Sequence, residues 1–183
     1  MPLQWNQQPD HVKQAFLDQK ATLVILPKGM KLWKLTGYKP SRNPNIHRFT
    51  PPITPWWSNY DPFKDDTRGV KGILKDSIAK SQIFLAYVRD RSAVTIEWNS
   101  LTYYMETKLL NDKEAFWGRY APQPVSKNPI YQTLYDGVYY PEALGGWPDA
   151  FQLYIPNLQT ADLATPEWFS STDNKALKAQ FGI

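Results

Sequence analysis

Proline is the feature that most limits how this chain can fold. The 183 residues include 16 prolines and only 9 glycines. Proline fixes φ and lacks a backbone N–H, so it interrupts helices and the interior of sheets. A bundle of long helices is therefore excluded, and short elements joined by long proline-rich loops are favoured. We predict one α+β domain over residues 1–183, with an N-terminal helical segment at 1–20 and mostly antiparallel short strands in two small sheets around a cleft.

The spacing of apolar residues predicts where the elements lie. Helical spacing predicts a short helix within Pro9–Gln19, with Asp10 as its N-cap, and a second helix over Gly69–Ala86. Asn99–Leu110 fits either a strand or a helix. Apolar or alternating runs predict strands at Thr22–Leu26, Met30–Thr36, Ile83–Val88, Ser92–Trp98 and Ala115–Tyr120. Short helical or extended pieces are expected at Pro166–Phe169 and Asn174–Phe181.

A stretch late in the chain, Leu144–Asn157, combines a Gly-Gly turn with a β-type run that a proline closes. Glycines can adopt positive φ and let the backbone approach a partner closely. Residues of the run alternate between the two faces of a strand, so the apolar set fits a core and the other face presents Gln152 and Tyr154. The pattern predicts either a half-buried strand with a polar outer face or a binding site beside a turn.

The composition excludes several kinds of chemistry. The sequence has no cysteine and only two histidines, His11 and His47, so disulfides, thiolate catalysis and a metal site built from Cys or His are not expected. No apolar stretch is long enough to span a membrane, and the first ten residues lack the apolar core of a signal peptide. We therefore expect synthesis in the cytoplasm without a signal peptide, and delivery to another cell by a signal-free route stays open.

Charge and known nucleotide motifs restrict the choice of ligand only weakly. The net charge of +4 permits an anionic partner without requiring one. There is no Gly-rich nucleotide fingerprint, no phosphate-binding loop ending in Gly-Lys-Ser/Thr and no nucleophile elbow. The proline-rich segment Lys39–Pro55 contains Arg42 and Arg48, and a loop of this length is usually functional or disordered. It leads into Trp56–Tyr60, an aromatic cluster that predicts either a core anchor or one wall of a cleft for a planar ligand.

Three short motifs, far apart in the sequence, form an ordered set. Lys34 lies at the end of an expected early strand, Ser58 follows two tryptophans, and Gln152 begins the late strand that ends in Ile-Pro. In this order they resemble the ADP-ribosyltransferase superfamily, which has a basic residue on an early strand, an aromatic-Ser element and a late strand carrying Glu or Gln. The stretch Phe116–Pro124, followed by the Gly-Gly turn and Gln152, also resembles the end of NAD glycohydrolases of the tuberculosis-necrotizing-toxin type, in which Gln replaces the transferase Glu.

The resemblance implies an NAD-consuming, toxin-like enzyme, either an ADP-ribosyltransferase or an NAD glycohydrolase, with NAD as its substrate. The N-glycosidic bond of NAD would break through an oxocarbenium-like state, and Gln152 and Ser58 would be the catalytic residues. Gln152 would accept a hydrogen bond from a ribose hydroxyl through its carbonyl oxygen. Ser58 would position the nicotinamide ribose or support Gln152.

The same resemblance implies where the rest of the dinucleotide binds. Lys34, with Arg42 or Arg48, would bind the pyrophosphate. Trp57 or Tyr60 would stack on nicotinamide. No metal is implied. The partners would be NAD, a protein or nucleic-acid target, and an immunity or inhibitor protein.

Two departures from the family pattern leave the activity open. Lys34 stands where transferases have Arg or His, and Lys cannot bind a phosphate bidentately as Arg does. Gln152 stands where they usually have Glu, and an amide supplies no negative charge. The chain could therefore be a glycohydrolase, a diverged transferase or an inactive relative that still binds. The alternatives are a non-catalytic binding module for nucleic acid or saccharide, and an interaction or structural component of a phage or secretion system.

Overall fold

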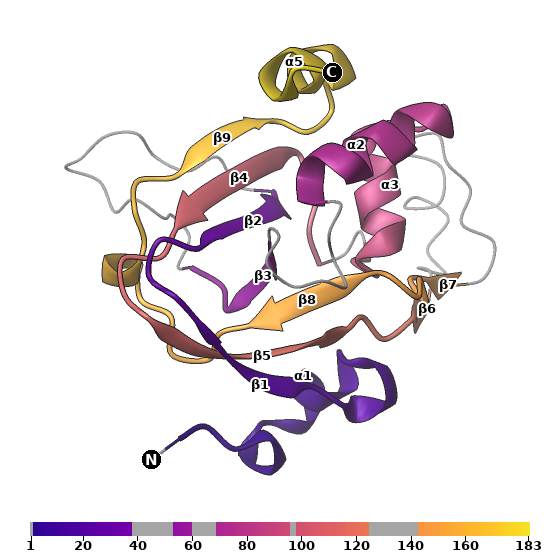
Figure 1. Ribbon diagram of the computed structural model, residues 1–183. Coiled ribbons are helices and arrows are strands. Elements are labelled where there is room, and N and C mark those ends of the chain that lie inside the picture. The colour runs from indigo at the N-terminus through magenta and orange to yellow at the C-terminus, as the bar shows by residue number, and fades with distance from the viewer. Residues whose placement is uncertain (1, 38–52, 60–68, 96–97, 125–142) are drawn as a thin grey trace.

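The computed structural model describes residues 2–37, 53–59, 69–95, 98–124 and 143–183, and Figure 1 shows their arrangement. The α-helices are α1 (Asp10–Gln14), α2 (Gly69–Ala79), α3 (Phe84–Arg91) and α5 (Asn174–Phe181). Short 3-10 turns form η1 (Trp5–Gln7), η2 (Leu17–Gln19) and η4 (Thr160–Asp162). The strands are β1 (Thr22–Leu26), β2 (Lys31–Thr36), β3 (Trp56–Asn59), β4 (Tyr103–Lys108), β5 (Lys113–Arg119), β6 (Gln123–Pro124), β7 (Ala143–Leu144), β8 (Phe151–Tyr154) and β9 (Glu167–Ser170).

Antiparallel pairing links most of these strands into one sheet. Within the described residues, seven strands follow the order β1-β5-β8-β3-β2-β4-β9, and β6 pairs with β7 in a separate two-stranded sheet. Every pairing is antiparallel, and helices and strands are interspersed along the chain. The predicted α+β class and the antiparallel character of the strands are confirmed.

The short strand β3 joins two halves of the large sheet. Its first two residues, ending at Trp57, pair with β8, and its last two, beginning at Ser58, pair with β2. Beyond Trp33, the rest of β2 pairs with β4 alone among the described strands. The two halves therefore separate on either side of β3, with β8, β5 and β1 in one half and β2, β4 and β9 in the other (Figure 1).

Clusters of buried apolar side chains hold the described elements together. One cluster joins both halves of the sheet and includes Leu32 and Leu153. A second packs α2, α3 and α5 against β2 and β4, with Trp33 and Leu74 among its members. A third packs the N-terminal segment against β5 and β8 through Phe16. The first cluster therefore ties the two halves together, and the other two pack helices and the N-terminal segment on either side of the space beside β3.

Most predicted strands are confirmed where the sequence alternates. Met30–Thr36 contains β2, Ala115–Tyr120 overlaps β5, and the ambiguous Asn99–Leu110 contains the strand β4. The remaining agreements are Thr22–Leu26 as β1, Pro166–Phe169 overlapping β9, and Asn174–Phe181 as α5.

The predicted strand at Ile83–Val88 is wrong, because Phe84–Arg91 forms the helix α3. Nearly every residue of α3 is buried, so its apolar positions run continuously and show no helical stripe. A short continuous apolar run does not distinguish a buried strand from a buried helix. The predicted helix over Gly69–Ala86 is also too long, since α2 ends at Ala79 and Ser81 follows with a φ of 56°.

Two smaller predictions also fail. Ser92–Thr95, the described start of the expected strand Ser92–Trp98, is not a strand, because Ala93 has a φ of 51° and turns the chain away from an extended path. Asp10 is not the N-cap of α1, because Pro9 occupies that position and the Asp10 carboxylate pairs with Lys13 at 2.8 Å.

Candidate functional site

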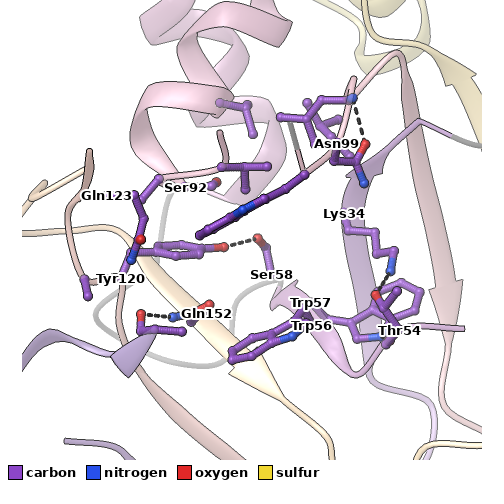
Figure 2. A pocket seen from close by; sticks show the side chains of 18 of the residues that line it. Lys34, Thr54, Trp56, Trp57, Ser58, Ser92, Asn99, Tyr120, Gln123 and Gln152 are labelled. Carbon is purple, nitrogen blue, oxygen red and sulfur yellow. Dashed lines mark hydrogen bonds between the residues drawn. The ribbon is translucent and has the colours of Figure 1, made fainter. Parts of the chain in front are cut away.

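A cavity of about 450 Å³ lies where β2 and β8 separate beside β3 (Figure 2). This volume is in the range of sites that bind small molecules and cofactors. Its walls come from β2, β3 and β8, from the N-terminal segment, from the end of α3 and the chain after it, and from the end of β5. The lining residues are His11, Ala15, Trp33, Lys34, Leu35, Thr54, Trp56, Trp57, Ser58, Val88, Ser92, Ala93, Val94, Trp98, Asn99, Leu101, Tyr120, Ala121, Gln123 and Gln152.

Lys34 enters the cavity from the part of β2 that has left β3. Its Nζ donates to Thr54 Oγ1 at 2.5 Å and lies 4.7 Å from the centre of the Trp57 ring. No carboxylate among the described residues forms an ion pair with it. Burial lowers the pKa of Lys34 to about 7, because removing an ammonium from water disfavours its charged form. An anion entering the cavity would meet a cation that no protein carboxylate in this region neutralises.

Ser58 lies at the point where β3 changes partner. Its side chain is 7 % exposed, and its hydroxyl shares a hydrogen bond of 3.2 Å with the phenol of Tyr120 at the end of β5. Figure 2 shows the Tyr120 hydroxyl pointing toward Ser58, with the hydrogen bond between them drawn as a dashed line. Because either oxygen can be the donor, this pair can offer a proton or a lone pair to a ligand hydroxyl.

Gln152 lies on β8 beside the N-terminal segment. Its side-chain nitrogen donates to the carbonyl oxygen of Ala15 at 2.7 Å, and the residue is 4 % exposed. This bond fixes which end of the amide faces the chain, so the carbonyl oxygen of the side chain remains available as an acceptor. The alternation of β8 is as predicted for Leu153, which packs in the core, and for Gln152, which lines the cavity. Tyr154, which was expected beside Gln152 on the polar face, is 9 % exposed and packs with Phe16 in the third cluster.

The structure brings together four of the seven predicted site residues: Lys34, Trp57, Ser58 and Gln152 all line this one cavity. Trp57 does so with only 2 % of its surface exposed, and its ring carries Lys34 on one side. It therefore serves as a support for the lysine and leaves little ring surface for stacking on nicotinamide. Tyr60 lies outside the described residues, and so do Arg42 and Arg48 with most of the loop Lys39–Pro55 that contains them.

Sequence reasoning missed other residues of the cavity, chiefly His11, Trp98 and Tyr120. Trp98 was expected at the end of the strand Ser92–Trp98, whose described start is not a strand, and its side chain is 64 % exposed. Tyr120 falls within the stretch Phe116–Pro124 that carries part of the family resemblance, so that motif held a usable signal. His11 offered none beyond the rarity of histidine, because a short amphipathic helix does not show which of its polar residues meets a distant strand.

The described lining contains no aspartate or glutamate, whereas His11, Lys34 and Tyr120 can all donate hydrogen bonds. This composition suits an anionic or hydroxyl-rich ligand. In the described residues, no group of three or more His, Cys, Asp or Glu side chains is placed to hold a metal ion. None of the helices described there has the length and apolar character needed to cross a membrane.

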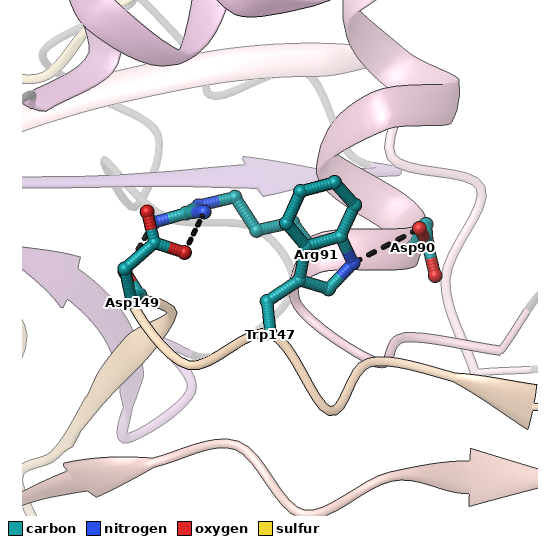
Figure 3. A network of polar contacts seen from close by, with 4 residues as sticks. All are labelled: Asp90, Arg91, Trp147 and Asp149. Carbon is teal, nitrogen blue, oxygen red and sulfur yellow. Dashed lines mark hydrogen bonds and ion pairs between the residues drawn. The ribbon is translucent and has the colours of Figure 1, made fainter.

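The last turn of α3 fixes the loop that precedes β8 (Figure 3). Asp90 accepts from the backbone N–H of Gly145 at 3.2 Å and from the indole N–H of Trp147 at 3.0 Å. Arg91 pairs with the Asp149 carboxylate at 2.8 Å and also donates to the Asp149 carbonyl. The loop is thus attached at both ends, and it holds the start of β8, and with it Gln152, in place.

Comparison of the chain with protein-family models, with curated proteins and with solved structures gave no significant match. The case for a function therefore rests on the cavity and on the motifs that line it.

Proposed function

We propose that this protein binds and consumes NAD, as an NAD glycohydrolase or an ADP-ribosyltransferase. The observation that carries the proposal is the adjacency of β2, β3 and β8 in the sheet, which brings Lys34, Ser58 and Gln152 into one cavity. Lys34 and Gln152 are separated by 118 positions in the sequence, and Ser58 lies between them. Convergence of all three supports the family resemblance of their motifs.

Cleavage of NAD is chemistry that a cavity without carboxylates can perform. The bond between C1′ of the ribose and the ring nitrogen breaks, and its electron pair goes to the nitrogen of the cationic pyridinium ring. Nicotinamide therefore leaves as a neutral molecule and needs no general acid. The oxocarbenium at C1′ then gains an oxygen from water, which releases a proton, or a nucleophilic atom from a target molecule.

In this reaction Gln152 orients the ribose. With its nitrogen held by Ala15, the side-chain carbonyl accepts from a ribose hydroxyl and fixes the sugar while C1′ becomes cationic. Ser58, coupled to Tyr120, bonds a second hydroxyl of the ligand or an incoming water. Gln152 contributes by position and by its dipole, since a neutral amide provides no full negative charge.

Lys34 binds the pyrophosphate in the proposed complex. Two phosphate charges beside Nζ favour the ammonium form and offset the cost of its burial. Binding near pH 7 should therefore take up part of a proton. The Trp57 ring beneath Nζ restricts the lysine to the cavity side, which compensates in part for the missing bidentate geometry of arginine.

Partners follow from the same proposal. In the transferase form, a protein or nucleic acid accepts the ADP-ribose. An enzyme that consumes NAD harms the cell in which the enzyme is made. In that cell the expected partner is an immunity or inhibitor protein that covers the cavity. Synthesis in the cytoplasm followed by signal-free delivery to another cell belongs to the toxin-like form of the proposal.

The test is release of nicotinamide from NAD by the purified protein, measured by liquid chromatography. ADP-ribose as co-product indicates the glycohydrolase, and a labelled macromolecule after incubation with lysate and labelled NAD indicates the transferase. The matched control for Gln152→Ala is Gln180→Ala, on the exposed surface of α5. The proposal fails if the wild-type protein releases no nicotinamide and modifies nothing, and retention on oligonucleotides or glycans would then favour a binding module.

A further inference from the structure

A buried arginine holds one wall of the cavity. Arg89 of α3 is 2 % exposed, and its guanidinium donates to the carbonyl oxygens of Val94 at 3.1 Å, Asn99 at 3.0 Å and Ser100 at 3.0 Å. All three acceptors belong to the segment that follows α3 and contributes Val94, Asn99 and Trp98 to the cavity. A fork of donors bound to three carbonyls ties the described residues on both sides of 96–97 to α3.

Contacts of the backbone fix the same segment further. The side-chain oxygen of Asn99 accepts from the N–H of Leu101 at 2.8 Å, and the N–H of Trp98 donates to the Thr95 carbonyl at 3.2 Å. Gly37, just after β2, lies so close that a Cβ there would be 2.6 Å from the hydroxyl oxygen of Ser100. The wall is therefore bonded to α3 on one side and lies directly beside the end of β2 on the other.

Trp98 stands on this fixed wall with its ring uncovered. It is 64 % exposed and lines the cavity, and no side-chain hydrogen bond among the described residues involves its indole. An exposed tryptophan on a rigid support keeps most of its apolar surface for a ligand and loses little conformational entropy when it stacks.

We infer that Trp98 is the stacking residue for the adenine ring of the dinucleotide, and that Arg89 is the positioning residue that holds it there. The inference rests on the proposed function. The reacting ribose must lie against Gln152, which is 4 % exposed, whereas Trp98 is mostly exposed. The ring that remains nearest to solvent in such a complex is the one remote from the reacting bond, which is adenine.

The test compares three probes bound by wild type, Trp98→Phe and Trp98→Ala, using calorimetry or thermal shift. The probes are NAD, adenosine monophosphate for the adenine end, and nicotinamide mononucleotide for the other end. Stacking of a base on an aromatic side chain implies a loss on the order of 10- to 100-fold in affinity for NAD and adenosine monophosphate in Trp98→Ala. Trp98→Phe should keep most of the affinity, and nicotinamide mononucleotide should bind all three proteins alike.

Arg89 is tested by the difference between the two ends of the ligand. Arg89→Lys keeps the charge but loses the three-point geometry, so it should weaken adenosine monophosphate and leave nicotinamide mononucleotide nearly unchanged. A purely structural role would weaken both probes equally. Arg91→Lys, which removes another buried guanidinium from α3, is the control and should not weaken adenosine monophosphate selectively.

The outcomes separate the inference from the proposal on which it rests. Unchanged affinity for adenosine monophosphate in Trp98→Ala overturns the inference, and so does a selective loss of nicotinamide mononucleotide. If the wild type binds adenosine monophosphate through Trp98 but releases no nicotinamide, the stacking stands and the enzymatic proposal fails. If the wild type binds none of the three probes, both are overturned.

Discussion

Two tryptophans, Trp98 and Trp147, lie in segments that are bonded to the last turn of α3, and their rings have opposite environments. Trp147, in the loop before β8, donates to Asp90 at 3.0 Å, meets Tyr87 edge-on at 5.4 Å and carries Lys80 at 4.3 Å from its ring. Trp98, on the wall that Arg89 holds, is 64 % exposed. Both segments are tied to the last turn of one helix. The last turn of α3 holds the first loop through the indole of Trp147, whereas it holds the second segment through backbone carbonyls. The ring of Trp98 in the second segment therefore stays exposed.

The largest expected effect is on the rate of the proposed reaction, at Gln152, which lines the same cavity as Trp98. Gln152→Ala should lower the rate of nicotinamide release about 10²- to 10³-fold, because one positioned electrostatic contact with the reacting sugar is lost. The variant also loses the bond to Ala15, so its unfolding midpoint should fall, and the rates are compared at a temperature at which a thermal scan shows both proteins folded. Equal rates for Gln152→Ala and wild type would show that the reaction does not occur at Gln152. The exposed ring of Trp98, in the same cavity, would then have no link to catalysis.

A second test concerns the loop that carries Trp147. Arg91→Met should lower the free energy of unfolding by about 2 kcal/mol, since it breaks a partly buried ion pair whose carboxylate, 42 % exposed, can still be hydrated. Urea denaturation measures this, with Lys175→Met on the exposed face of α5 as the control. A change below about 0.5 kcal/mol, the range of ordinary surface substitutions, would show that α3 does not hold this loop.

The tryptophans themselves should differ in stability. Trp147→Phe loses the hydrogen bond to Asp90 and should destabilise the fold by about 1–2 kcal/mol. Trp98→Phe should stay within about 0.5 kcal/mol of wild type, as expected for an exposed side chain. The two variants unfolded side by side in urea make the comparison directly, and equal losses would contradict it.

The smallest expected effect is the pH dependence of Lys34. Burial lowers its pKa to about 7 from 10.5, so between these pH values the unfolded chain binds more protons than the folded one. The cost of burying the lysine is therefore largest below pH 7 and fades as the pH rises. Lys34→Met should raise the unfolding midpoint by about 2–4 °C at pH 7 and less at pH 9.5. A gain that is constant over this pH range would mean that Lys34 titrates normally.

Alternation located the site residues on β2 and β8 correctly but failed at Ser92–Trp98, and the fully buried helix α3 was missed. Alternation placed Lys34 on β2 and Gln152 on β8, and the motif order predicted that both would meet Ser58. The helix α3 was taken for a strand, because a short fully apolar run has no period to measure. Trp98 was assigned to a strand because Ser92–Trp98 alternates, and the contacts of Arg89 with carbonyls further along the chain, which hold this segment differently, could not be predicted from the sequence.

The four residues of β3 carry a consequence for how faithfully this chain must fold. Since side chains alternate along a strand, a slip of one residue in its pairing would exchange the faces of Trp57 and Ser58, which would take the indole out of its core cluster and the hydroxyl away from Tyr120. The strand β8 fixes the register of the first half of β3, and β2 fixes the register of the second half. The cavity therefore has its observed lining only when β3 pairs in the correct register with both of its neighbours.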